Sequence, residues 1–262
     1  MPASIRVELT TADGVVLSAL HWDSGIRDLG CVVAHGFTGS ASKPHVRAIC
    51  VALRERGFGV IAPDMRGHGR SGGLCTAGAD ERLDVAAAVD WMRARGYERV
   101  AVLGWSMGGS AVLRYAGLGG EADAVVAVSS PGRWFERGTR PMRIVHLMCE
   151  TRTGRLATRV ARRTRIAGAA WDAKLPEAPA EVAGSIAPTP LLIVHGEADH
   201  YFPVGHFEAL AAATPDADHW LEPGMGHAET ATTPELLARI ADWVAAAVRG
   251  ARRGVCDDGS RE

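Results

Sequence analysis

The feature that most restricts the fold of this chain is a series of short apolar runs with no alternation of polar residues. These runs lie at residues 31–34, 60–62, 100–103, 124–128 and 191–194. Strands buried on both faces of a parallel sheet need such continuous apolar sequence. The stretches between the runs have helical spacing, as at residues 82–95, where Gly96 follows in a position that favours a helix C-terminus. Strands that alternate with helices predict an α/β fold, a parallel sheet covered by helices on both faces.

The two ends of the chain show other patterns. Residues 5–9 and 15–20 alternate with period two on either side of Ala12-Asp13-Gly14, which predicts an antiparallel hairpin. Near the C-terminus, Thr232 and Glu235 have the spacing of a capping box ahead of an apolar stripe, which predicts the last helix. Residues 249–262 are polar and contain glycine, so we expect a loose tail from about residue 250.

The length of 262 residues is above the usual size of one domain, but α/β folds of this size commonly form one unit, so a single domain is expected. Between Pro131 and Pro188 no strand is recognisable, although a crossover needs only about a dozen residues. We therefore expect an insertion at about residues 132–188, with helices at 139–150 and 154–166.

Composition excludes several classes of protein. A hydrophobic fraction of 47% suits a globular chain with a large core, and a net charge of −1 gives no overall attraction for nucleic acid. The five cysteines form no CxxC pair, which favours free thiols over a zinc site or a disulfide framework. Because neither a signal-peptide pattern nor an apolar run of about 20 residues is present, we expect a cytoplasmic protein without a transmembrane segment.

The strongest chemical motif is Gly104-Trp105-Ser106-Met107-Gly108, which lies between the apolar run at 100–103 and a helical pattern at 111–115. In that context G-x-S-x-G indicates a nucleophile elbow, where small residues flank a tight turn and the serine projects from the sheet. An ordinary glycine turn is the alternative, since the five letters also occur by chance. The pattern predicts Ser106 as a nucleophile, above a helix N-terminus that stabilises a developing anion.

A serine nucleophile needs a base and an acid that orients the base. Asp199 lies just beyond the run at 191–194, and His227 lies before the last helix, in the order Ser, Asp, His that such enzymes show. Glu197 is the rival acid. A loop histidine is more often solvated or a cap, which is the interpretation for His45, His206 and His219, whereas His227 is the predicted base.

Two backbone amides are expected to bind the oxyanion. One is the amide of Met107, and the other is that of Phe37 in His35-Gly36-Phe37-Thr38-Gly39, whose glycines permit close approach. The alternative for this segment is a turn that ends a strand and has no chemical role.

Together these motifs resemble the α/β-hydrolase superfamily, and most of all its serine esterases and its monoacylglycerol-lipase-like and cinnamoyl-esterase-like members. The segments that carry the resemblance are residues 35–39, 63–71, 104–109, 196–199 and 226–227. The resemblance implies a mostly parallel eight-stranded α/β-hydrolase sheet, a helical cap formed by the insertion, and a structural rather than catalytic loop at residues 64–69. Ser106 argues against the dehalogenase and epoxide hydrolase branches, which use aspartate there.

The expected cap is rich in arginine. Residues 133–165 contain ten arginines against Glu136 and Glu150, a net charge of +8 that leaves −9 for the rest of the chain. Five arginines recur there at helical spacing, opposite Leu156 and Val160, namely Arg152, Arg155, Arg159, Arg162 and Arg163. This face could attract an anionic substrate or partner, such as an acyl group on a phosphorylated carrier or an anionic lipid surface. The favoured interpretation is a solvated outer face whose apolar side covers the pocket.

The predicted function is that of a serine carboxylic-ester hydrolase acting on a small-molecule acyl ester, without a metal or organic cofactor and without a nucleic-acid partner. Thioesters and small amides are alternative substrates, and a perhydrolase, a carbon–carbon bond hydrolase or a non-hydrolytic binding protein of the same fold is an alternative function. No oligomeric state is indicated. The candidate substrate-binding residues are Trp105, Trp134, Ile144, Leu147 and Met148, with Phe135 and Trp171 as further apolar cap residues.

Overall fold

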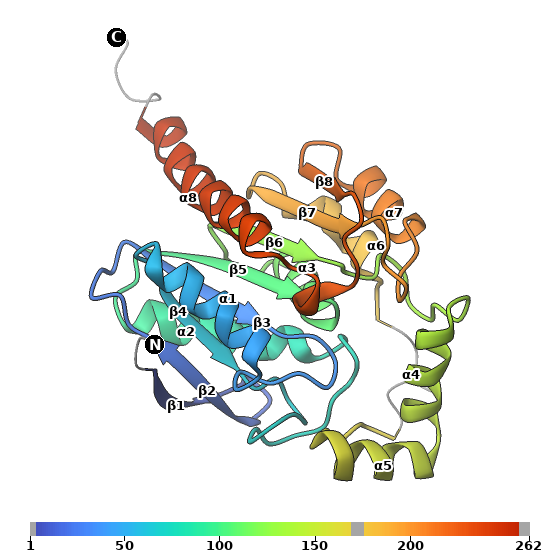
Figure 1. Ribbon diagram of the computed structural model, residues 1–262. Helices are drawn as coiled ribbons and strands as arrows, with labels where there is room; N and C mark the ends of the chain where they lie inside the picture. The colour runs from blue at the N-terminus through green and yellow to red at the C-terminus, as the bar shows by residue number, and fades with distance from the viewer. Residues whose placement is uncertain (1–3, 169–175, 257–262) are drawn as a thin grey trace.

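The first hairpin and the apolar runs form one sheet in the computed structural model, which describes residues 4–168 and 176–256 (Figure 1). Within these residues the sheet has eight strands in the order β1-β2-β4-β3-β5-β6-β7-β8. They are β1 (Ile5–Thr10), β2 (Val16–Trp22), β3 (Leu29–Ala34), β4 (Gly59–Pro63), β5 (Arg99–Trp105), β6 (Ala124–Val128), β7 (Leu191–Gly196) and β8 (Asp218–Glu222). β1 and β2 pair in antiparallel fashion, as do β2 and β4, and every other pairing is parallel. The predicted mostly parallel eight-stranded sheet is confirmed.

The burial of each strand explains which strands can be recognised in the sequence as continuous apolar runs. β3, β4, β6 and β7 are buried along their whole length, as the continuous apolar runs predict. β8 lies at the edge of the sheet, and its residues Asp218-His219-Trp220-Leu221-Glu222 are exposed or half-buried. An edge strand needs no continuous apolar sequence, so no such run marks β8.

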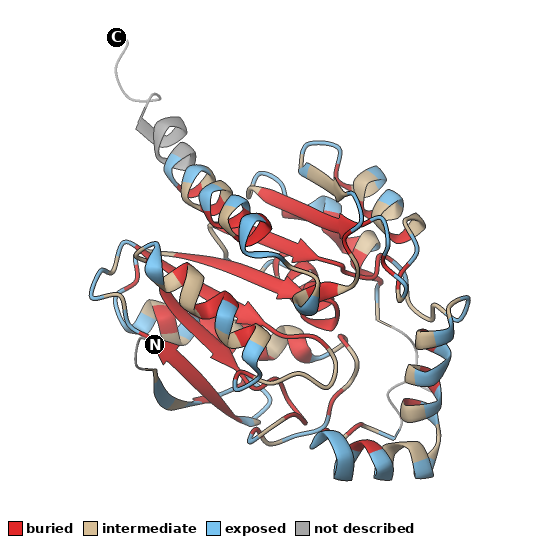
Figure 2. Ribbon diagram, viewed as in Figure 1, coloured by how far each residue is buried: buried red, intermediate tan, exposed pale blue. Residues whose placement is uncertain are grey.

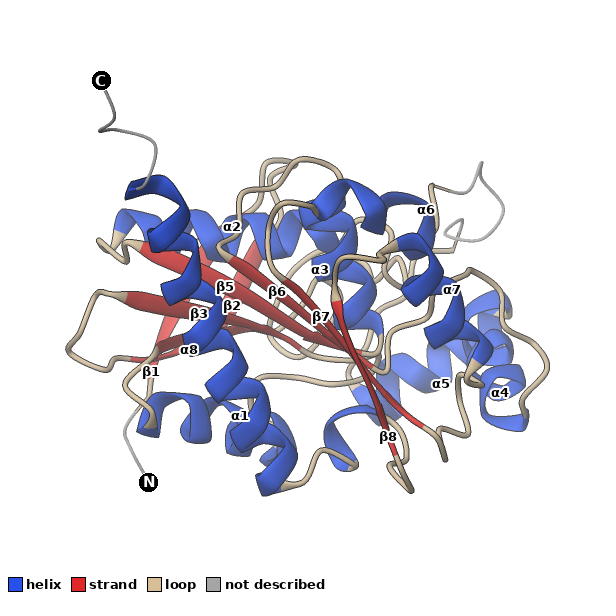
Figure 3. Cartoon of the chain, turned by 90° about the horizontal axis from the view of Figure 1, so that it is seen from above, coloured by secondary structure: helices blue, strands red, loops and turns tan. Residues whose placement is uncertain are grey.

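Helices cover both faces of the sheet, as predicted (Figure 3). The helices α1 (Pro44–Glu55) and α8 (Pro234–Cys256) pack on one face through residues such as Leu53 and Ile240. The helices α2 (Glu81–Ala94), α3 (Met107–Gly117) and α7 (Gly205–Ala213) lie on the other, where Met92, Val112 and Leu210 join the second half of the core. Among the helices of the described residues, none is both long and apolar enough to cross a membrane.

The start of α8 differs by one residue from the prediction. The hydroxyl that accepts the amide of Leu236, at 3.2 Å, belongs to Thr233, so Thr233 rather than Thr232 is the N-cap. Thr232 accepts a hydrogen bond from the indole nitrogen of Trp105 at 3.0 Å instead. At its other end α8 continues to Cys256, past the point where the tail is predicted to begin, and residues 257–262 lie outside the described part.

Between β6 and β7 the chain forms the predicted helices α4 (Arg140–Glu150) and α5 (Arg152–Arg162), which stand apart from the sheet in Figure 1. The short helices α6 (Pro179–Ala183) and η1 (Gly184–Ile186) then return the chain to β7. Thr139 caps α4 by accepting the amide of Met142, and Arg163, at φ 55°, ends α5 before the predicted residue 166. Trp171 lies outside the described residues.

The expectation that the apolar side of α5 covers a pocket is wrong. Leu156 and Val160 are 62% and 75% exposed, and the one buried residue of α5 is Thr158. Figure 2 shows the exposure that runs along α4 and α5. A hydroxyl-bearing side rather than an aliphatic side of α5 therefore faces the protein.

Candidate active site

Ser106 occupies the sharp turn between β5 and α3. Its φ of 52° and ψ of −117° are strained for a residue with a side chain, and its amide donates to the carbonyl of Val128 at 2.9 Å. The flanking glycines are required by contact: a Cβ on Gly104 would lie 2.1 Å from the carbonyl oxygen of Gly108, and one on Gly108 would lie 2.1 Å from that of Ala34. The turn holds Ser106 at the carboxyl end of the parallel strands.

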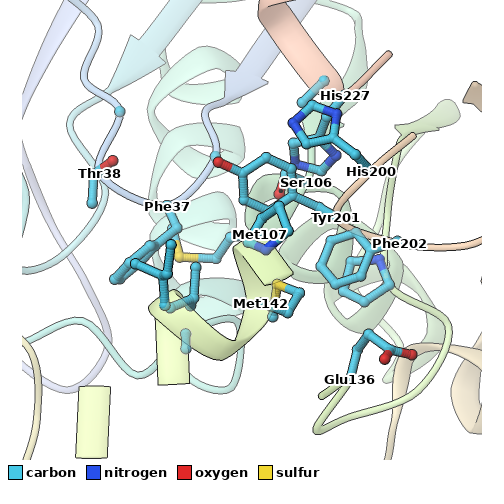
Figure 4. A pocket seen from close by; sticks show the side chains of 18 of the residues that line it. Phe37, Thr38, Ser106, Met107, Glu136, Met142, His200, Tyr201, Phe202 and His227 are labelled. Carbon is cyan, nitrogen blue, oxygen red and sulfur yellow. Dashed lines mark hydrogen bonds between the residues drawn. The ribbon is translucent and has the colours of Figure 1, made fainter. Parts of the chain in front are cut away.

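Ser106, His227 and Asp199 form a continuous chain of hydrogen bonds. His227 Nε2 lies 2.9 Å from Ser106 Oγ (Figure 4). His227 Nδ1 lies 2.8 Å from Asp199 Oδ2. Because a carboxylate can only accept, Nδ1 carries the proton of the neutral ring and Nε2 is left to accept from the serine hydroxyl. The structure thus brings together the three side chains that the sequence predicts, in an arrangement able to take a proton from Ser106.

The Asp199 side chain is held in its charged form. Burial by itself would raise its pKa, but the hydrogen bond from His227 and those from the amides of Tyr201, at 2.8 Å, and Phe202, at 3.0 Å, bring the pKa below its ordinary value. Glu197, the rival acid, is exposed and forms no hydrogen bond with His227. The geometry therefore favours Asp199.

Two aromatic rings contact the imidazole of His227, and sequence reasoning missed both. Tyr201 stacks on it with centroids 4.3 Å apart and an interplanar angle of 28°, and Phe202 meets it edge-on at 5.5 Å. Figure 4 shows Tyr201 next to Ser106 and His227. The signal that could have found them is position, since both follow Asp199 within its loop. The stack restricts rotation of the ring that must remain aligned with Ser106.

The predicted oxyanion donors belong to segments that lie close to the Ser106 side chain. The amides of Phe37 and Met107 donate to no acceptor among the described residues. A Cβ added to Gly36 would lie 3.2 Å from Ser106 Cβ, so the loop of residues 35–39 approaches the nucleophile closely. Glu229, which sequence reasoning also missed, accepts the Gly36 amide at 2.6 Å and so positions this loop.

Two buried histidines support the same loop as neutral rings. His35 donates from Nδ1 to the carbonyl of Gly36 and accepts the amide of Met65 at Nε2. His68 donates from Nδ1 to Arg66 and accepts the amide of Thr38 at Nε2, 3.1 Å away. Burial is the main reason that the pKa of each is lowered from 6.5 to about 4, and for His68 the neighbouring His35 adds to it. Protonation of either ring would remove the acceptor that an amide uses.

This arrangement predicts loss of stability in mild acid. The unfolded histidine binds a proton near pH 6.5 and the folded one only near pH 4, so the contribution of each is complete above pH 6.5 and disappears as the pH falls to about 4. For His68 the loss is about 3 kcal/mol. Urea unfolding measured between pH 6.5 and about pH 4 should show that the free energy of unfolding of His68→Gln falls by about 3 kcal/mol less than that of the wild type. His200→Gln, at an exposed site, should lose as much as the wild type. Equal pH dependence of His68→Gln and wild type would contradict the prediction.

A cavity of about 780 Å³ opens onto Ser106, Met107 and His227. Trp134, Phe135, Ile144 and Met148 from the inserted segment line it, as does Phe37 from the loop. The cavity wall also includes residues that the sequence does not single out, among them Thr38, Met142, Val145, Tyr201 and Phe202. A large cavity with a mainly apolar wall that also carries polar and charged side chains is typical of small-molecule sites.

Two predicted substrate-binding residues do not reach this cavity. Trp105 is fully buried in the core beneath α1 and α8, because alternation along β5 directs it with Leu103 to that face of the sheet. Leu147 is 60% exposed and is not part of the cavity wall. Its position on α4 places it on the outer side of the helix, whereas Val145 and Met148 face the cavity.

Comparison with known proteins agrees with this architecture. Residues 32–148 match the family described as "alpha/beta hydrolase fold". A protein of Escherichia coli O157:H7, named "Uncharacterized protein YfhR", is 26% identical over 220 residues, which cover 78% of this chain and 66% of that protein, so the chain spans slightly less than two thirds of its length.

Two solved structures are also similar. The esterase Pf2001 of Pyrococcus furiosus is 25% identical with a TM-score of 0.73, and the match covers 93% of this chain and 91% of that one. The α/β hydrolase GrgF of Penicillium sp. sh18 is 19% identical with a TM-score of 0.77, over 94% and 99% of the two chains. The second likeness concerns the fold alone.

Proposed function

Because the chain is a member of the α/β-hydrolase superfamily, we propose that it is a serine hydrolase that cleaves carboxyl esters through an acyl-enzyme. The observation that carries the proposal is the hydrogen-bonded chain from Ser106 Oγ through His227 to Asp199, which lies at the wall of a large cavity. The esterase Pf2001, whose structure superposes over most of the chain, is consistent with ester substrates.

In the proposed mechanism His227 Nε2 takes the proton of Ser106 as the hydroxyl oxygen attacks the acyl carbon. The amides of Phe37 and Met107, which have no partner among the described residues, donate to the resulting oxyanion. His227 then gives its proton to the departing alcohol, whose bond to the acyl carbon breaks. His227 Nε2 then takes a proton from a water molecule as the water oxygen attacks the acyl-enzyme, and it returns that proton to Ser106 Oγ as the bond between Oγ and the acyl carbon breaks and the acid leaves. Asp199 stabilises the imidazolium in both steps.

We further propose that the chain forms a single domain in which the insertion at about residues 132–188 acts as a cap over Ser106. Trp134, Met142 and Met148 support this role, because they come from that segment and line the cavity. Their apolar surfaces suit an acyl or aromatic group next to the nucleophile. Thioesters and small amides would meet the same groups, so the cavity rather than the hydrogen-bonded chain selects among substrates.

Covalent labelling with a fluorescent fluorophosphonate tests the proposal. The reagent reacts with an activated serine hydroxyl, so the wild type is expected to be labelled and Ser106→Ala is not. Ser110→Ala is a matched control, because Ser110 lies one turn along α3 and its buried hydroxyl has no hydrogen-bond partner in the described part of the chain. Labelling should also abolish the hydrolysis of p-nitrophenyl esters. A wild type that takes up no label would rule out the proposed nucleophile.

A further inference from the structure

Most arginines of α4 and α5 are exposed and have no acidic partner among the described residues. Within the described residues, none of the following forms an ion pair: Arg140, Arg143, Arg152, Arg159, Arg162 and Arg163. The two acids of the segment are already engaged, since Glu136 pairs with His206, and Glu150 with Arg137 and His146. The segment at residues 133–165 therefore presents uncompensated positive charge while the rest of the chain carries −9.

The apolar residues of α5 point away from the protein. Thr158 is buried, and with 3.6 residues per turn Leu156 and Val160 lie on the opposite side of the helix. The same spacing places Arg152 and Arg159 beside these two residues rather than opposite them, which corrects the arrangement expected from the sequence for this pair. Arg163, which is also exposed, directly follows the helix. We call the set of Leu156, Val160, Arg152 and Arg159 the outer face of α5.

The neighbouring helix repeats the pattern. On α4, Ile144 and Leu147 are 52% and 60% exposed and lie beside Arg140 and Arg143. The two helices pack closely, because a Cβ on Gly154 of α5 would lie 2.3 Å from the carbonyl oxygen of Leu147. Two consecutive helices thus expose aliphatic side chains among arginines that form no ion pair within the described residues. Neighbouring exposed apolar side chains of this kind indicate an interaction surface.

The charge of this face restricts what covers it. A second copy of the chain docked through the same face would bring arginine against arginine, and like charges held together in an interface are unfavourable. An aliphatic stripe bordered by guanidinium groups instead matches a surface that is anionic outside and apolar beneath, which is the interfacial region of an anionic bilayer. We propose that the outer face of α5 docks on an anionic phospholipid surface, with Leu156 and Val160 in the headgroup region and the arginines on lipid phosphates.

Docking in this way would orient the cavity. Arg140 and Ile144 of α4 and Arg162 of α5 belong to the cavity wall and are exposed, so the cavity borders the docking helices. A ligand that partitions into the bilayer would then enter beside the surface on which the protein rests. The binding itself requires neither Ser106 nor hydrolysis.

Sedimentation with vesicles tests the docking surface. The full chain carrying Ser106→Ala, which leaves the lipid intact, is mixed with vesicles of phosphatidylcholine or of phosphatidylcholine containing about 30% phosphatidylglycerol. Binding is expected only to the anionic vesicles and should weaken as salt is added. Leu156→Ser with Val160→Ser should weaken binding at least about tenfold. Arg152→Gln with Arg159→Gln should weaken it roughly twenty-fivefold, at about fivefold for each arginine.

Matched substitutions on the body of the protein serve as controls. Ile26→Ser with Leu118→Ser removes aliphatic side chains that are 56% and 45% exposed, and Arg70→Gln with Arg249→Gln removes two exposed charges. Both controls should bind anionic vesicles like the parent. Equal binding to both kinds of vesicle, no binding, or equal losses in the controls would overturn the proposal, as would a dimer in light scattering that Leu156→Ser with Val160→Ser dissolves.

The outcome is separable from that of the proposed hydrolysis. Leu156 and Val160 are not part of the cavity wall, so their substitution in the chain with Ser106 should leave turnover of a short soluble ester unchanged. Turnover without vesicle binding would contradict only the proposed docking surface, and vesicle binding without turnover would contradict only the proposed hydrolase activity.

Discussion

Replacing Ser106 with alanine is expected to lower kcat/KM for a p-nitrophenyl ester by about a millionfold, because the atom that forms the acyl-enzyme is removed. His227→Ala should cost nearly as much, and the double variant should be little worse than either. Groups that act as one unit lose their whole effect when one member is absent. Initial rates for the two single variants and the double variant measure this non-additivity directly.

The control for this series is Ser110→Ala, which removes a buried hydroxyl from the same helix and should keep turnover close to that of the wild type. Losses that multiply in the double variant would mean that Ser106 and His227 act independently. So would a Ser106→Ala protein that retained a substantial fraction of the wild-type rate.

The second large effect concerns the acid. Asp199→Asn should reduce kcat about ten-thousandfold while leaving KM nearly unchanged. An asparagine amide that donates toward His227 Nδ1 would favour the tautomer with its proton on Nε2, and that nitrogen could then no longer accept from Ser106 Oγ. Glu197→Gln, two residues away and exposed, makes the same chemical change without a bond to His227 and should leave kcat intact. A large loss of kcat in Glu197→Gln together with an unchanged kcat in Asp199→Asn would identify Glu197 as the acid.

Most of the fold follows from local pattern. Strands β3 to β7 are apolar because both faces are covered, and the hairpin of β1 and β2 alternates because its outer strand is largely exposed. The three side chains of the hydrogen-bonded chain are also predictable, since Ser106 needs glycines around it and Asp199 and His227 follow the ends of neighbouring strands. In each case a requirement of the backbone restricts which residue types occur at adjacent positions in the sequence.

The residues that sequence reasoning missed depend on contacts between distant segments. Glu229 binds the amide of Gly36, and Tyr201 stacks on His227, yet no local pattern marks either pairing. The prediction that Trp105 binds the substrate is wrong, because strand alternation directs its side chain into the core although the next residue is Ser106. The orientation of α5 cannot be predicted from its sequence, because an amphipathic pattern defines two faces of a helix without specifying which one meets the protein.

The hydrogen bond from Trp105 to Thr232 has a consequence for how the protein accommodates substrates. Trp105 precedes the nucleophile, and Thr232 belongs to the segment after His227, which is also tied to the end of β6 by the bond from the Ala228 amide to Ser129. These two hydrogen bonds join the segments that carry the nucleophile and the base, whereas α4 and α5 contribute only to the wall of the cavity. Substitutions in that wall should alter which acyl groups are accepted and leave the proton path between Ser106 and His227 at a constant length.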